Sequence, residues 1–148
     1  MKKLLSILLV LLLITGSACA STQFYMYNAL AKMYGAPLLT EDMLMEETEK
    51  KIEYVCGNLR IMFGCVNSTE INSAAVYGAD STDFLPACAC TAFTLSESSE
   101  DAVNFLGNLL YAYMTVKSGK ESAYGFFGSM YFTISSSEEG LKFIVGDP

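Results

Sequence analysis

Cysteines carry the most reactive side chains in this sequence, and their number and spacing favour disulfide bonds. Four of them follow an N-terminal segment that we interpret below as an export signal: Cys56, Cys65, Cys88 and Cys90. An even number of cysteines in an exported chain is typical of disulfides, because that compartment oxidises thiol pairs. A bond within Cys88-Ala89-Cys90 would close a strained ring, but in an extended segment both thiols point to one face. We therefore expect two crosslinks between residues 56–65 and residues 88–90, with the pairing left open.

A metal site and a redox centre are the alternative roles for these thiols. The paired Cys-x2-Cys knuckles of structural zinc sites are absent, and no Cys-x-x-Cys dithiol occurs. The chain contains no histidine, which removes histidine-ligated metals and every catalytic mechanism that needs a histidine base. We expect a structural role for the cysteines, with no metal and no cofactor.

Carboxylates are the remaining groups for acid–base catalysis, because glycoside cleavage needs two carboxyl groups that face each other. The candidates lie in expected loops and turns: Glu70, Asp80, Asp83, Glu97, Glu138 and Glu139. Nothing in their spacing selects a pair, and phosphate-binding and dinucleotide-binding glycine motifs are also absent. Catalytic residues therefore stay unknown.

Five aromatic residues cluster between positions 124 and 132 and form a candidate apolar binding surface: Tyr124, Phe126, Phe127, Tyr131 and Phe132. If they face outward, such rings hold an apolar ligand or a partner protein. The competing interpretation is that about half of them face the core and the other half lie under a neighbouring element.

The N-terminus has the three parts of a secretory signal. Lys2 and Lys3 precede an apolar run from Leu4 to Ile14, and small residues follow up to Ala20. We expect a signal peptide over residues 1–20, cleaved after Ala20, and a protein that is secreted, periplasmic or held in the cell envelope. The alternatives are a lipoprotein, with Cys19 lipidated after cleavage at Ala18, and a retained anchor.

The remaining residues, 21–148, are strongly acidic and are expected to form a single small domain. All sixteen acidic residues lie there together with seven of the nine basic ones, so its net charge is −9. Such a charge disfavours binding to nucleic acid or to anionic lipid surfaces. After signal removal we expect no membrane span.

Periodicity predicts helices and strands that position these groups. The expected helices cover residues 22–35, about 40–57 and 99–118, and the expected strands cover residues 71–77, 87–95, 130–135 and 141–145. Residues 59–66 fit either a strand or a helix end. The uncharged stretch from Ala102 to Val116 predicts a central helix of the core.

This order predicts an α+β fold, with an antiparallel sheet of about four or five strands packed on two or three helices and stabilised by disulfides. One sheet face is expected under the helices and the other partly open. The first functional hypothesis is an exported, non-catalytic module that binds another protein. The second is a carrier of an apolar small molecule in a cavity between the sheet and the helix at 99–118. The third is a small carboxylate-based hydrolase.

Overall fold

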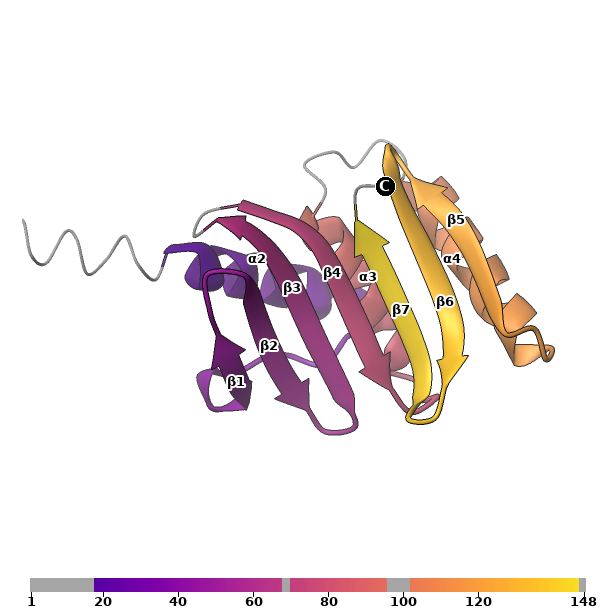
Figure 1. Ribbon diagram of the computed structural model, residues 1–148, viewed down its shortest axis with the longest axis horizontal. Coiled ribbons are helices and arrows are strands. Elements are labelled where there is room, and N and C mark those ends of the chain that lie inside the picture. The colour runs from indigo at the N-terminus through magenta and orange to yellow at the C-terminus, as the bar shows by residue number, and fades with distance from the viewer. Residues whose placement is uncertain (1–17, 68–69, 96–101, 147–148) are drawn as a thin grey trace, which may run out of the picture.

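The computed structural model describes residues 18–67, 70–95 and 102–146, in which one antiparallel sheet of seven strands packs on three helices (Figure 1). The helices are α2 (Ala18–Tyr34), α3 (Phe84–Leu95) and α4 (Ala102–Lys117). The strands are β1 (Leu44–Glu47), β2 (Lys51–Cys56), β3 (Leu59–Asn67), β4 (Glu70–Gly78), β5 (Ser122–Phe127), β6 (Met130–Ser137) and β7 (Gly140–Gly146). The predicted α+β class is confirmed, and the expected number of strands is too low.

The sheet consists of two similar halves that meet at its centre. Its strand order is β1-β2-β3-β4-β7-β6-β5, and every neighbouring pair is antiparallel. In each half a helix is followed by a three-stranded meander, since α2 precedes β2-β3-β4 and α4 directly precedes β5-β6-β7. The last strands of the two meanders, β4 and β7, pair with each other, with Val76 opposite Phe143. Figure 1 shows these two strands side by side in the middle of the sheet.

Residues 40–57 are the first segment where the structure differs from the expected elements. Thr40 does not cap a helix with its side chain. Instead the backbone N–H of Met43 donates to the Thr40 carbonyl at 3.1 Å and closes a single 3₁₀ turn, η1 (Glu41–Met43), which leads into β1 and β2. The expected helix is wrong because the same residues also alternate, with Ile52 and Tyr54 of β2 packed in the core.

Residues 87–95 are the second difference, because they belong to α3 and not to a strand. Pro86 lies in the first turn of α3. Backbone N–H groups of a first turn have no acceptor within the helix, so the N–H that proline lacks costs no hydrogen bond. The Thr91 hydroxyl donates to the Ala87 carbonyl at 2.7 Å, and Thr94 makes the same bond one turn later. These bonds satisfy both hydroxyls within the helix, so a stretch rich in threonine and cysteine lies buried as a helix.

The core lies between the helices and one face of the sheet, and its centre is aromatic. Phe105 of α4 stacks on Phe127 of β5, with ring centroids 4.3 Å apart. Phe93 of α3 meets both of these rings edge-on, at 5.4 and 5.3 Å. Phe132 of β6 joins the cluster at 5.5 Å from Phe105. The cluster ties α3 and α4 to the sheet.

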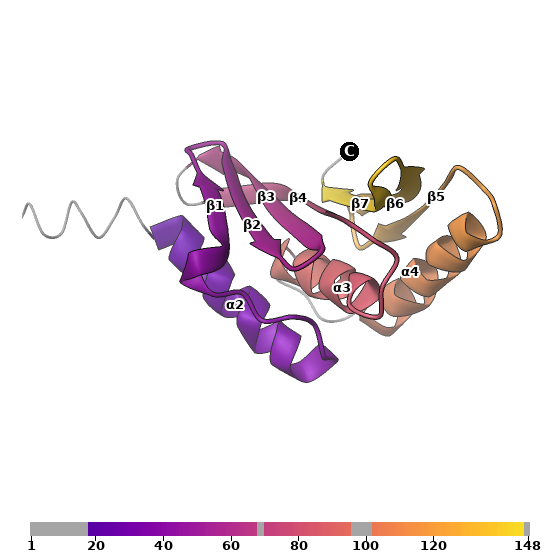
Figure 2. The ribbon, with the colours of Figure 1, turned by 90° about the horizontal axis from the view of Figure 1, so that it is seen from below.

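The helices cover one face of the sheet, and no described helix covers the other (Figure 2). On the covered face the strands present buried apolar residues such as Ile61, Phe63 and Val145. On the open face they present a mixture of charged, aromatic and small residues, for example Arg60, Tyr77 and Ser73. The expectation of one covered and one open face is met.

Helix α4 confirms the element expected over residues 99–118, but its environment differs from the prediction. Phe105 and Leu109 are buried against the sheet, whereas Val103 is 83% exposed and Leu110 is 52% exposed. The central core helix is α3, which is buried along nearly its whole length. None of the described helices combines the length and the apolarity needed to cross a bilayer.

Candidate functional site

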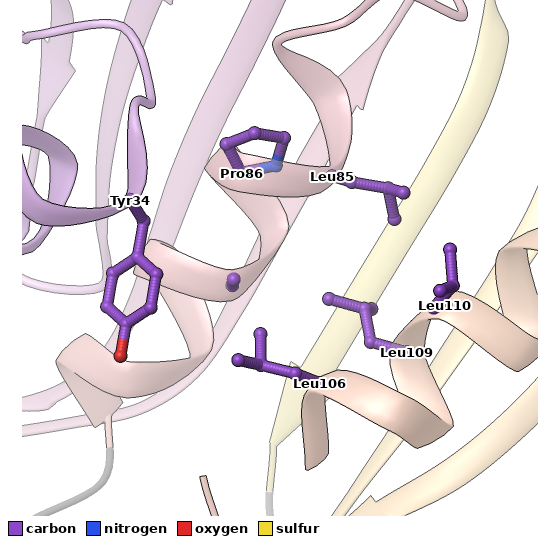
Figure 3. Close-up of a pocket in the computed structure, with 7 residues that line it drawn as sticks. Tyr34, Leu85, Pro86, Leu106, Leu109 and Leu110 are labelled. Carbon is purple, nitrogen blue, oxygen red and sulfur yellow. The ribbon is translucent and has the colours of Figure 1, made fainter. Parts of the chain in front are cut away.

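Three helices line an apolar groove on the outer surface of the helical layer, and α3 lies between α2 and α4 as its floor (Figure 2). The groove has a volume of about 200 Å³. Its lining residues come from all three helices: Tyr34 of α2; Leu85, Pro86 and Ala89 of α3; Leu106, Leu109 and Leu110 of α4. Figure 3 shows the leucines of α4 across from Leu85 and Pro86, with Tyr34 on the other side of α3.

The position of Tyr34 follows from local interactions at the end of α2. The Tyr34 ring stacks on Phe93 of α3 at 5.4 Å. Gly35 then adopts a φ of +72°, which ends the helix in a conformation that favours glycine. The Asn28 side chain holds the segment that follows, because its Nδ2 donates to the Leu39 carbonyl and its Oδ1 accepts from the Leu39 N–H, both at 2.8 Å.

The floor and the opposite wall follow from the side chains of α3 and α4. α3 is rich in small buried residues, and the short side chain of Ala89 lies in the floor of the groove. α4 carries no charge from Ala102 to Val116, and Val103, Leu106, Leu110 and Met114 recur at spacings of three and four residues. This stripe extends the apolar wall of the groove by one turn at each end.

The groove has almost no polar chemistry. Among its lining residues the Tyr34 hydroxyl is the sole polar side-chain group. Within the described part of the chain, no group of three metal-ligating side chains of the His, Cys, Asp and Glu types comes together. The arrangement suits the binding of apolar groups and offers no acid, base or nucleophile.

A second recess of about 280 Å³ lies on the open face of the sheet, over the small residues of β3 and β4. Lys51 lies at its rim, but its ammonium is engaged by Glu46 at 2.6 Å and by Glu53 at 2.9 Å. Arg60 donates two hydrogen bonds to the same Glu53 carboxylate, at 2.9 and 2.7 Å. Because Lys51 and Arg60 both donate to it, the pKa of Glu53 is lowered. A carboxylate held ionised in this way is not a general acid.

The five predicted aromatic residues divide between the two sides of the β5–β6 hairpin. Tyr124, Phe126 and Tyr131 point out of the open face, with the Tyr131 ring 5.9 Å from Tyr124 and 5.8 Å from Phe126. Phe127 and Phe132 point into the core. The alternation of a strand produces this division. Two of the five rings face the core, but the other three are exposed and do not lie under a neighbouring element, as the competing interpretation expected.

The four cysteines do not form the expected crosslinks, since the described residues contain no disulfide. Cys88 and Cys90 lie two residues apart in α3, so their side chains point in directions about 200° apart and not to the same face. Cys56 ends β2 beside the turn into β3, and Cys65 lies near the far end of β3. Burial raises the pKa of Cys90 to about 12 and that of Cys88 well above its ordinary value.

Cys19 lies in the first turn of α2, where its side chain is not described, and its lipidation stays a prediction.

Two of the candidate carboxylates, Asp80 and Glu139, lie beside basic side chains. Asp80 binds Lys117 and accepts a hydrogen bond of 2.5 Å from the Tyr113 hydroxyl, and both contacts lower its pKa. Glu139 lies 3.8 Å from Arg60 at the surface. Glu97 lies outside the described residues. The structure therefore gives no support to the hydrolase hypothesis.

The groove was not among the predicted sites, although one signal for it is present in the sequence. A helix that packs on a sheet needs one apolar face, and residues 102–116 carry more apolar positions than one face can hold. The second set of these residues lines the groove.

Comparison of the chain with protein-family models, with curated proteins and with solved structures finds no match.

Proposed function

We propose that this protein is an exported, non-catalytic interaction module that binds an apolar segment of a partner protein in the groove between α2, α3 and α4. The size of the groove is the observation that carries the proposal. At about 200 Å³ it falls below the roughly 300–1,000 Å³ of sites that enclose small molecules. It accommodates one or two apolar side chains of a partner.

The surroundings of the groove support a protein rather than a free ligand. The stripe of Val103, Leu106, Leu110 and Met114 continues the apolar surface along about three turns of α4, one turn beyond the groove at each end. An amphipathic helix with apolar residues three and four positions apart matches such a surface. The groove also lacks the converging polar groups that orient a small ligand. The carrier hypothesis placed its ligand elsewhere, between the sheet and α4.

Site-specific photocrosslinking tests the proposal in the native envelope or medium. A photoreactive phenylalanine analogue at Val103 should give a discrete crosslinked species, because this position adjoins the groove and is 83% exposed. The same analogue at Met45, which is exposed on β1, is the matched control and should give none. Leu110→Asp in the Val103 variant should remove the species, because it places a charge in the groove.

Equal crosslinking at Val103 and Met45, or no species at Val103, would refute the groove as a docking site. Native mass spectrometry provides the second measurement. An apolar small molecule retained by the purified protein and lost in Leu110→Asp would support the carrier hypothesis instead.

The pattern of residues 1–20 is the reason to propose that the module is exported. Because compartments outside the cytosol are oxidising, disulfides between its cysteines remain part of the proposal. Peptide mapping of the mature protein with and without reduction tests both points. We expect a chain that begins at Ser21, whereas a lipidated Cys19 at the N-terminus would identify the lipoprotein alternative. A retained Met1 in cytosolic protein would contradict export.

A further inference from the structure

The two edges of the sheet differ in how they are protected against pairing with another strand. β1 is four residues long, carries Glu46 and Glu47, and has an irregular register with β2 between Leu44 and Glu46. Short length, charge and irregularity are the features with which proteins block an edge strand. β5, at the other edge, has none of them.

β5 is a regular strand of six residues without charge or proline. It pairs with β6 in an unbroken register from Ser122 to Phe127, and its other side has no pairing strand among the described elements. Tyr124 is 69% exposed and Phe126 is 58% exposed on the open face beside this edge. An edge of this kind presents unpaired backbone N–H and C=O groups together with apolar side chains.

α4 packs behind β5, and the part of α4 beside this strand also carries no charged side chain. On α4 the flank turned away from the groove carries Asn104, Asn108, Tyr111 and Thr115, as the helical repeat of 100° per residue requires. Along the chain the charged residues nearest to β5 are Lys120 and Glu121, one of each sign, directly before its first residue. Lys117, at the end of α4, is bound to Asp80. The six residues of β5 and the flank of α4 behind them therefore carry no charge.

We propose that β5 pairs antiparallel with the β5 of a second copy of this chain, so that two sheets become one continuous sheet. The charge distribution identifies the second copy as the occupant. Two copies of residues 21–148 that each carry a net charge of −9 repel each other, and they meet at lowest cost where neither carries charge. Pairing through β1 would instead bring Glu46 and Glu47 of both copies together.

A two-fold axis through Gly125 sets the register of this pairing. Tyr124 of each copy then lies opposite Phe126 of the other, which gives two cross-strand aromatic pairs on the open face. A stable dimer buries about 800 Å² per partner, more than one six-residue strand provides. The exposed rings of Tyr124 and Phe126, with Tyr111 behind the strand, supply further apolar area.

Sedimentation equilibrium of the mature chain between about 1 and 100 μM tests the proposal. The expected result is a dimer whose dissociation constant rises at least about tenfold in Tyr124→Lys. Met45→Lys is the matched control on the β1 edge, where the side chain is also exposed, and should leave association unchanged. A chain that stays monomeric throughout this range, or equal effects of the two variants, would overturn the proposal.

The register is tested by the double variant Tyr124→Lys with Phe126→Glu. In the proposed pairing each introduced lysine faces an introduced glutamate of the other copy, so association should return at low salt and weaken as salt is added.

Hydrogen exchange of wild-type β5 provides a readout without mutation. Its amides that do not bond to β6 should exchange more slowly as protein concentration rises, and exchange independent of concentration would contradict the pairing.

Discussion

At the scale of single residues, buried charge and buried thiols determine the chemistry of this protein. Glu53 is 6% exposed, yet it remains ionised because Lys51 and Arg60 together donate three hydrogen bonds to it. Burial raises the pKa of the Cys88 and Cys90 thiols, and no described cation opposes this effect. The pKa of Glu53 is lowered and the pKa of each thiol is raised, because only Glu53 has positive partners.

Replacing Glu53 should change how stability depends on pH. Its pKa is lowered in the folded state from an ordinary 4.5, so its contribution is complete above that value and is lost as the pH falls below it. Glu53→Gln should therefore be less stable than the wild type by about 1 kcal/mol at neutral pH, and the difference should shrink between about pH 5 and pH 3. Urea unfolding at several pH values measures it, and a difference that is constant with pH would contradict this account.

Cys88 and Cys90 should resist alkylation in the folded protein at about pH 8, because only the thiolate reacts and burial raises the pKa of both groups. For the free thiols that the structure shows, unfolding in urea without a reductant makes both reactive, which mass spectrometry of the labelled peptides would detect. If they become reactive only after reduction, disulfides are present and the sulfur chemistry expected for an exported chain holds.

At the scale of elements, α4 carries two apolar surfaces with different tasks. Leu109 is buried against the sheet, whereas its neighbour Leu110 is half exposed at the groove. Leu109→Ala should cost about 2–5 kcal/mol, and Leu110→Ala should stay within about 0.5 kcal/mol of the wild type. Thermal or urea unfolding compares the two variants directly. Equal losses would mean that the groove is covered in the folded protein and is not a docking surface.

At the scale of the whole molecule, the two halves are joined by the pairing of β4 with β7 and by α3. Phe93 of α3 contacts Tyr34 of the first half as well as Phe105 and Phe127 of the second. We expect a single cooperative unfolding transition, because neither half has a complete core without these contacts.

Phe93→Ala tests this coupling. Truncation of the ring should lower stability by about 3–5 kcal/mol, and hydrogen exchange should accelerate equally in β3 and β6, which lie in different halves. Faster exchange confined to one half would show that the expected single domain consists of two independent units.

Helices and strands were predicted correctly where the local sequence pattern fits only one type of secondary structure. The repeats of α2 and α4 and the alternation of the β6–β7 hairpin appear in the structure close to their expected bounds. Residues 40–57 and 87–95 were misassigned because their local signals were ambiguous. A capping threonine followed by acidic residues also fits a 3₁₀ turn, and Cys-Ala-Cys fits a helix as well as a strand.

The amino-acid sequence by itself determined the charge, the absence of histidine chemistry, the α+β class and the elements with clear periodicity, because these depend on composition and on neighbours along the chain. The tertiary structure decided which apolar residues are core and which are surface. Val103 and Leu109 are equally apolar, and only the position of α4 under β5 and β6 exposes one and buries the other. The same holds for the β5 edge, since an edge exists only after the order of the strands is known.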